Sequence, residues 1–265
     1  MSVAAFPTPE AFLGVARPIR ALVVGAGGTG CQVLDGLASL DAALRAQDHA
    51  GFEVTVMDDD VISASNIGRQ RYAQAEIGFP KCIQLVRRIN GFHTVNWVAQ
   101  PLRLSPNDPA VARFDLVLSC VDKGAFRADL GRYWKGHNSE TLWLDTGNGA
   151  SRGQCVIGHL GKPRSRRLPN VFDLYGNDLR SGEDEDLPSC SVAEALTRQH
   201  FSVNRAVATA AIALLDDLIH RGGLDAHGTF LRTNPFSAQP LRIDPAVWAT
   251  FGYVESAKQR KKKTA

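Results

Sequence analysis

The sequence predicts an α/β fold built on a doubly wound, mostly parallel sheet, with C-terminal helices and a closing antiparallel extension. Two observations carry most of this prediction. Over residues 20–150, short apolar runs alternate with segments whose apolar residues have helical spacing. In addition, a glycine-rich turn joins the first apolar run to the first helical segment. Strand, helix, strand in this rhythm implies parallel strands with helices on both faces of the sheet.

The individual elements follow from the same periodicities. Strands are expected at 20–24, 52–57, 94–99, 115–120 and 141–145. Helices are expected at 31–44, 83–89 and about 126–133. The run DLVLSC at 115–120 is the clearest buried strand, since all of its central residues are apolar.

The chain divides into four parts. Residues 1–19 form an N-terminal arm that Pro7, Pro9 and Pro18 interrupt, and 20–150 form a Rossmann-like nucleotide-binding core. Residues 151–257 complete the same domain with a strand at 152–160, a crossover loop at 161–188, helices at 191–199 and 203–219, and a hairpin at 229–233 and 239–243. Residues 258–265 form a disordered basic tail.

Composition indicates a globular protein, with 44% hydrophobic and 22% charged residues. The absence of a long apolar run or a secretion signal predicts a cytoplasmic protein without membrane contact. The tail from Lys258 carries five of the positive charges, so the rest of the +3 chain sums to +3 less 5, or −2. The tail is interpreted as a solvated terminus; binding of nucleic acid or an acidic partner is the alternative.

The five cysteines are scattered, and no two form a C-x-x-C pair. Neither a disulfide framework nor a four-cysteine zinc site is therefore expected. Zinc is not among the expected cofactors.

The glycine turn runs from Gly25 to Gly30 as G-A-G-G-T-G and lies between a predicted strand and a predicted helix. In that context Gly25 permits the tight turn, Gly27 and Gly28 let the backbone approach a phosphate or ribose, and Gly30 lets helix and strand pack closely. The helix N-terminus supplies N–H groups and partial positive charge for an anion. A tight turn without a ligand is the alternative interpretation.

Asp58 follows the second strand, where its carboxylate can accept hydrogen bonds from both ribose hydroxyls. An NAD-dependent dehydrogenase would place an acidic residue there as well. The glycine turn and Asp58 therefore do not separate hydride transfer from nucleotidyl transfer.

The stretch MDDDVISASNIGRQ at 57–70 resembles the signature of the ThiF, MoeB and ubiquitin-activating enzyme superfamily. The matching residues are Asp58, Asp60, Val61, Ser65, Asn66, Arg69 and Gln70. The sequence IGFPK then supplies Gly78 and Lys81, and LSCVD places Asp122 where the family has its metal-binding aspartate. With the glycine turn, the resemblance covers about residues 20–150.

The resemblance implies that ATP and Mg²⁺ are the cofactors and that the C-terminal glycine of a ubiquitin-like protein is adenylated. Arg69 and Lys81 can neutralise phosphates, Asn66 can donate to one, and Asp122 can hold Mg²⁺. The alternatives are structural: Arg69 and Lys81 as exposed charges, Asn66 as a turn former and Asp122 as a helix N-cap. The family also implies a homodimer that completes its site with an arginine from the neighbouring arm. Arg17 and Arg20 are the candidates, and Arg17 is favoured because Arg20 begins a predicted strand.

Ubiquitin-type activating enzymes move the acyl group on to a cysteine, and Cys190 is the candidate nucleophile. It directly precedes a predicted helix at Ser191, whose N-terminus would stabilise a thiolate. The acidic run Glu183–Asp186 argues against it, because negative charge raises a thiol pKa. A plain cysteine is the alternative. The other four, Cys31, Cys82, Cys120 and Cys155, are interpreted as packing residues.

The segments LPNVFDLYG at 168–176, PSCS at 188–191 and NRAVA at 204–208 resemble the ThiF-related protein of the PRTRC cassette. That resemblance implies a conjugating-enzyme-like protein as a further partner. Two other functions stay open: a non-catalytic ATP-binding scaffold, and an NAD-dependent oxidoreductase, which leaves Asn66, Arg69, Lys81 and Asp122 without a task.

Overall fold

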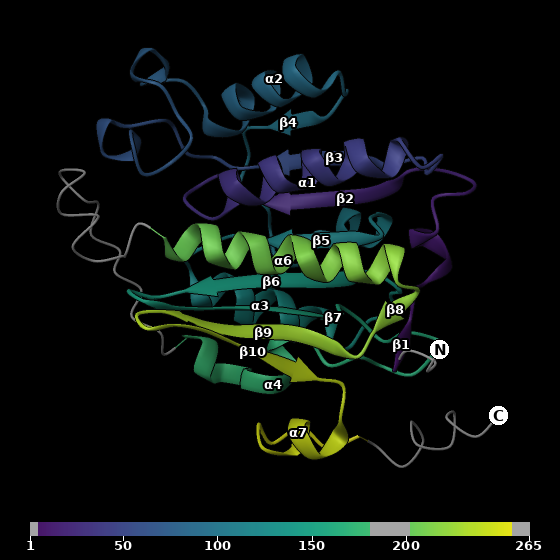
Figure 1. Ribbon diagram of the computed structural model, residues 1–265. Coiled ribbons are helices and arrows are strands. Elements are labelled where there is room, and N and C mark those ends of the chain that lie inside the picture. Colours follow the sequence, from purple (N-terminus) through teal and green to yellow (C-terminus); the bar gives the residue numbers. More distant parts are fainter. Residues whose placement is uncertain (1–4, 181–201, 256–265) are drawn as a thin grey trace.

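The computed structural model describes residues 5–180 and 202–255. They form an eight-stranded sheet in the order β10-β9-β7-β6-β5-β2-β3-β4 (Figure 1). Its strands are β2 (Ile19–Val24), β3 (Phe52–Met57), β4 (Val98–Gln100), β5 (Leu116–Ser119), β6 (Leu142–Asn148), β7 (Arg152–His159), β9 (Ala226–Thr233) and β10 (Phe236–Arg242). The two-residue strands β1 (Phe6–Pro7) and β8 (Gly223–Leu224) pair separately.

The sheet has a parallel and an antiparallel half. Strands β4, β3, β2, β5 and β6 are parallel to their neighbours, whereas β7, β9 and β10 continue the sheet with antiparallel pairs. The predicted fold class, a mostly parallel doubly wound sheet with an antiparallel extension, is therefore confirmed.

Helices cover both faces of the sheet. They are α1 (Gly30–Arg45), α2 (Lys81–His93), α3 (Gly124–Trp134), α4 (Val171–Tyr175), α6 (Val203–His220) and α7 (Pro245–Ala249). Helices α1 and α6 lie side by side in front of the sheet, and α3 lies behind it (Figure 1). Alternate residues of β2 supply the two cores: Ala21 and Val23 pack with α1 and α6, and Leu22 packs with the residues around α3.

Two expectations need correction. The strand expected at 94–99 is shorter and begins later, as β4 at Val98–Gln100. Thr94 cannot belong to it, because this residue adopts a left-handed conformation with φ 55° that ends α2. The side chain of Asn90 then accepts from Trp97 N at 3.0 Å and donates to Trp97 O at 2.9 Å, which holds this segment against the helix. The crossover at 161–188, expected as a loop, contains α4 and a 3₁₀ helix at Gly176–Arg180 within its described part.

The N-terminal arm lies against the domain. Its 3₁₀ helix at Glu10–Phe12 buries Phe12, which is 1% exposed, in the core beside α1 and α6. The expected helix at 191–199 and the basic tail at 258–265 lie outside the described residues. No helix of the described ranges is long and apolar enough to cross a membrane.

Candidate nucleotide site

The candidate site lies where the carboxyl ends of three neighbouring strands meet. Strand β2 lies between β3 and β5, and its last residue, Val24, is in register with Met57 and Ser119. Gly25 N donates to Met57 O at 2.9 Å, and Cys120 N donates to Val24 O at 2.8 Å. From β2 the strand order runs to β3 and β4 on one side and to β5 and β6 on the other. This reversal makes the carboxyl end of β2 the switch point where open α/β sheets bind ligands.

The glycines of the loop differ in how much space a side chain would have at each position. Gly25 has φ 94°, and a Cβ there would lie 2.7 Å from the carbonyl oxygen of Cys120. A Cβ on Gly30 would overlap the carbonyl oxygen of Gly25. At Gly28 it would lie 2.6 Å from Nδ2 of Asn204 on α6. A Cβ on Gly27, by contrast, would meet no atom of the described protein within 4 Å. Packing therefore accounts for three of these glycines and leaves open space beside Gly27.

Asp58 joins the end of β3 to the glycine loop. Its Oδ2 accepts from Ala26 N at 2.6 Å, and its Oδ1 accepts from Asp60 N at 2.9 Å. Burial raises the pKa of Asp58 above its ordinary value, although these amides and the charge of Lys81 favour the ionised form. The carboxylate is half-buried at the strand end, where the sequence predicts it.

Lys81, in the first turn of α2, lies against the loop that follows β3. Only 6% of the residue is exposed, and its Nζ lies 2.7 Å from Oδ2 of Asp60. The interpretation of Lys81 as an exposed charge is therefore wrong. An ammonium held inside the fold loses hydration and needs a counter-charge, which Asp60 supplies.

Asn66 is 7% exposed and ends the 3₁₀ helix at Ala64–Asn66, where its Oδ1 accepts from Ser63 N at 2.9 Å. The side-chain oxygen of Asn66 thus stabilises a turn, which is the structural alternative to nucleotide binding named for this residue. Gln70 is 8% exposed, and its Oε1 finds no donor within the described residues.

Arg69 and Asp122 lie on different loops, close enough for the charge of Asp122 to act on Arg69. Burial lowers the pKa of the Arg69 guanidinium, while the negative charge of Asp122 acts in the opposite direction. Their charges interact although one residue follows β3 and the other follows β5. Asp122 is exposed, and α3 begins at Gly124 with Lys123 in the N-cap position. The interpretation of Asp122 as a helix N-cap is therefore wrong.

Sequence reasoning missed a polar cluster beneath the glycine loop. Thr29 Oγ1 donates to Asn204 Oδ1 at 2.9 Å and accepts from Asn148 Nδ2 at 2.8 Å; Asn148 also donates to Asn204. Thr29 and Asn204 are buried. The cluster therefore fixes the start of α1 against β6 and α6. The run NRAVA was noticed only as a resemblance, and Asn148 gave no signal beyond following a predicted strand.

A buried ion pair supports the site from the side of β6. Asp145 is fully buried, and its Oδ1 accepts from Arg127 Nε at 2.8 Å and from Ser119 Oγ at 2.6 Å. Arg127 also donates to the second oxygen of Asp145. The pair links α3 to the ends of β5 and β6.

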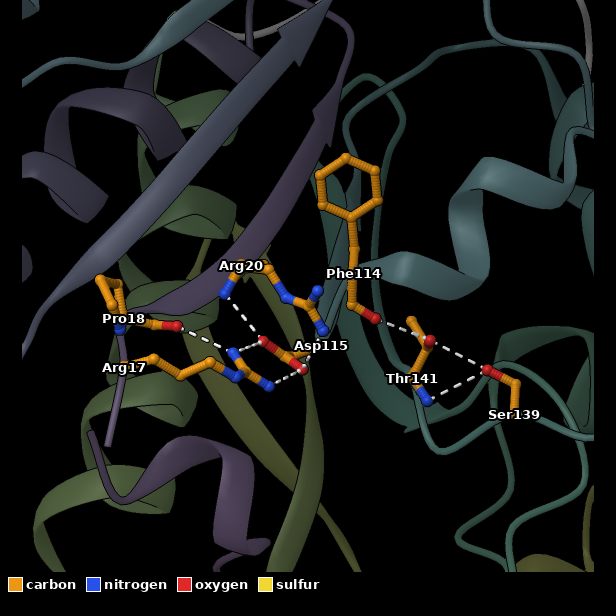
Figure 2. Close-up of polar contacts among 7 residues, drawn as sticks. All are labelled: Arg17, Pro18, Arg20, Phe114, Asp115, Ser139 and Thr141. Atoms are coloured by element: carbon orange, nitrogen blue, oxygen red, sulfur yellow. Dashed lines mark hydrogen bonds and ion pairs between the residues drawn. The ribbon is translucent and has the colours of Figure 1, made fainter. Parts of the chain in front are cut away.

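Arg17 lies at the other edge of the sheet (Figure 2). Its guanidinium donates to both oxygens of Asp115, at 2.6 and 2.8 Å, and Arg20 N donates to the same carboxylate at 2.9 Å. Burial opposes ionisation of Asp115, yet these hydrogen bonds hold its pKa below its ordinary value. These contacts stand at the amino ends of β2 and β5, so Arg17 does not reach the nucleotide site of its own chain. Its use by a neighbouring subunit stays a prediction.

The cysteines of the described residues are buried and free of disulfides. Burial raises the pKa of Cys120 and of Cys155 to about 12, which keeps both as thiols. Burial and a thiol that stays protonated are both typical of cysteines that serve as packing residues. Cys190 and the acidic run before it lie outside the described residues. Within the described ranges, no three His, Cys, Asp or Glu side chains gather as a metal site.

The family comparison agrees with this geometry. The model of the ThiF family matches residues 5–247, which is most of the chain. This chain belongs to the ThiF family.

Curated relatives match less than half of this ThiF-family chain. The adenylyltransferase and sulfurtransferase UBA4 of Debaryomyces hansenii is 34% identical over 113 residues, which are 41% of this chain and 23% of the relative. The molybdopterin-synthase adenylyltransferase of Escherichia coli is 33% identical over 115 residues, 42% of this chain and 43% of the relative. The matches thus span less than half the length of either relative.

Solved structures share the fold over most of the chain. The crystal structure of E. coli MccB has a TM-score of 0.57 at 13% identity and covers 89% of this chain and 65% of that one. That of PaaA has a TM-score of 0.56 at 11% identity, covering 88% of this chain and 66% of that one.

Proposed function

We propose that this protein uses ATP to adenylate the C-terminal glycine of a ubiquitin-like protein. One observation carries the proposal: open space remains beside Gly27 at the carboxyl end of β2, next to the ends of β3 and β5. The loop after β3 carries Arg69 and the Asp60 that pairs with Lys81, and the loop after β5 carries Asp122. Hydride transfer to a dinucleotide requires no such set of two cations and an exposed carboxylate. Breaking a triphosphate does, because negative charge must be neutralised as pyrophosphate leaves.

Each residue has a role in this reaction. The amides at the start of α1 bind phosphate oxygens next to Gly27, and Asp58 accepts from the ribose hydroxyls. Arg69 and Lys81 pair with the phosphates, and Asp60 keeps Lys81 oriented through their ion pair. Asn66 and Gln70 supply further polar groups to the nucleotide.

Asp122 is suited to hold Mg²⁺. The ion prefers oxygen ligands and takes few from the protein when phosphates supply the rest, which fits the exposed carboxylate of Asp122 after β5. When bound, Mg²⁺ supplies charge neutralisation for the triphosphate.

The reaction balances without another reactant. A carboxylate oxygen of the terminal glycine attacks the α-phosphorus of ATP, and the bond from that phosphorus to the bridging oxygen breaks. The products are an acyl-adenylate and pyrophosphate. The protein holds both reactants in line, which converts a bimolecular step into one within a complex.

The names of the relatives support the reaction class, since UBA4 and the molybdopterin-synthase enzyme are both adenylyltransferases. The finer points belong to the proposal alone. The protein is proposed to act as a homodimer in the cytoplasm, with a core at 20–150 that residues 151–257 complete. It is proposed to belong to a PRTRC-type cassette with a conjugating-enzyme-like partner. The acyl group is proposed to pass to Cys190 as a thioester.

The test is exchange of labelled pyrophosphate into ATP, with each ubiquitin-fold protein encoded by the neighbouring genes. We expect partner-dependent exchange that Asp122→Ala abolishes. Asp216→Ala is the matched control, because Asp216 is a half-exposed carboxylate whose partner within the described residues is His220 on its own helix α6. No exchange with any such partner would refute the proposal.

Two other outcomes identify the alternatives. Tight ATP binding without exchange, together with salt-sensitive DNA binding that is lost on removal of residues 258–265, would identify a scaffold. Thermal stabilisation by NAD and not by ATP with Mg²⁺ would identify an oxidoreductase.

A further inference from the structure

A pocket of about 590 Å³ lies next to the candidate nucleotide site. Its walls come from α3, from the turn between β6 and β7, and from the surface of β9 and β10. Asn148 lines this pocket and also donates to Thr29 at the start of α1. One residue thus touches both the pocket and the glycine loop, so a ligand in the pocket is a neighbour of a nucleotide on the loop.

The charged side chains that line the pocket are all basic. Arg127, Arg152 and Arg232 line it, and within the part of the chain that the structure describes no aspartate or glutamate does. Asp145 already neutralises Arg127 through their buried ion pair. Arg152 and Arg232 therefore dominate the charge that a ligand meets.

These two arginines repel each other. Arg152 on β7 and Arg232 on β9 are directly opposite in the antiparallel register, an arrangement in which like charges destabilise a sheet. Neither has a carboxylate within ion-pair distance in the described ranges. Gln154, on β7 like Arg152, and Gln239, on β10, add amide groups to the same pocket. A carboxylate between the guanidiniums would relieve the repulsion and accept hydrogen bonds from both.

We propose that this pocket selects a protein tail that carries an acidic side chain in the last few residues before its terminal glycine. The inference rests on the proposed function, because adenylation requires that tail to end at the glycine loop. An extended tail that enters through the pocket passes Asn148 before it reaches the loop. Its acidic side chain pairs with Arg152 and Arg232 on the way. In the proposed function the phosphates of the nucleotide bind at the start of α1, which leaves the pocket to the tail.

The experiment measures binding of labelled synthetic peptides that end in Gly-Gly, in the presence of ATP and Mg²⁺. One glutamate is placed in turn at each position before the glycines, and a matched series carries glutamine. We expect one position at which glutamate binds about three- to tenfold more tightly, as for an ion pair in a partly open site. The double variant Arg152→Gln/Arg232→Gln loses this preference and folds normally, because it removes a repulsion.

The matched control is Arg242→Gln. Arg242 is an exposed arginine on β10 that does not line the pocket, so this variant keeps the preference. Equal binding of the glutamate and glutamine peptides at every position would overturn the inference, and so would the absence of any peptide binding. A preference that persists in the double variant would also overturn it, since another basic surface would then attract the acid.

Nucleotide binding and pyrophosphate exchange are measured on the same samples. Retained ATP binding and exchange without peptide selectivity would reject the pocket and leave adenylation intact. Absence of ATP binding would reject the proposed function itself.

Discussion

Replacement of Gly27 by alanine separates nucleotide binding from folding. A methyl group there meets no atom of the described protein within 4 Å, and the residue's φ lies outside the left-handed region. Without a ligand the variant is therefore expected to fold and to gain about 0.4–1 kcal/mol of unfolding free energy, because alanine restricts the unfolded chain. The same methyl group occupies the space in which a phosphate approaches the loop. We expect ATP affinity to fall at least about tenfold, which corresponds to about 1.4 kcal/mol.

Calorimetric titration with ATP and Mg²⁺ measures the affinity, and urea denaturation measures the unfolding free energy. Gly91→Ala is the matched control, because a Cβ at Gly91 also meets nothing within 4 Å but lies on α2. It should gain stability and keep its affinity for ATP. Gly25→Ala should instead destabilise the protein, since its φ is 94° and its Cβ would meet the carbonyl of Cys120. Unchanged ATP affinity in Gly27→Ala would refute the placement of the nucleotide.

Three further predictions concern charged and titrating groups. Lys81→Met should lower ATP affinity at least about tenfold by titration calorimetry, whereas Lys162→Met, which removes an exposed lysine, should not; equal affinities would contradict the role of Lys81. Arg127→Met leaves the buried carboxylate of Asp145 without its cation and should cost about 3–5 kcal/mol in urea denaturation; a cost below about 1 kcal/mol would contradict this. His227 is expected to make the fold sensitive to acid, because burial lowers its pKa to about 4 from the ordinary histidine value of 6.5. Between these two pH values the unfolded chain binds a proton that the folded chain does not, so unfolding free energy falls by about 3 kcal/mol as pH decreases; an unchanged pH dependence in His227→Gln would contradict this.

In addition to burial, a hydrogen bond from Trp248 favours the neutral form of His227. The indole Nε1 donates to His227 Nε2 at 2.8 Å, and the other ring nitrogen lies 2.8 Å from Ile157 O. The ring therefore donates from Nδ1 and accepts at Nε2, and a second proton would face the indole N–H. Nothing in the sequence near residue 227 indicates this environment.

Local signals were sufficient for most of the parallel half of the fold, with β4 as the exception. The apolar runs at 20–24 and 52–57 are buried strands, and the glycine turn begins α1 where predicted. Each of these depends on neighbours in sequence. The strand expected at 94–99 failed because the contact between Asn90 and Trp97 outweighs the strand propensity of the apolar residues.

Contacts between distant segments explain what the sequence could not predict. Thr29 and Asn204 are 175 positions apart, and Arg17 and Asp115 are 98 positions apart. No periodicity or spacing reports such pairs. The pairing of Arg17 with Asp115 depends on β2 and β5 being neighbours, and the like-charged pair Arg152 and Arg232 depends on the register of β7 with β9.

Transfer of a labelled AMP group tests the central claim most directly. ATP labelled at its α-phosphate is incubated with the protein and a ubiquitin-fold protein from the neighbouring genes, and the partner is then analysed by mass spectrometry and autoradiography. The account predicts one AMP on the terminal glycine, an equal amount of pyrophosphate, and no label on a partner whose C-terminal carboxylate is amidated. Label on the amidated partner, or ATP bound with no AMP transferred to any candidate, would contradict it.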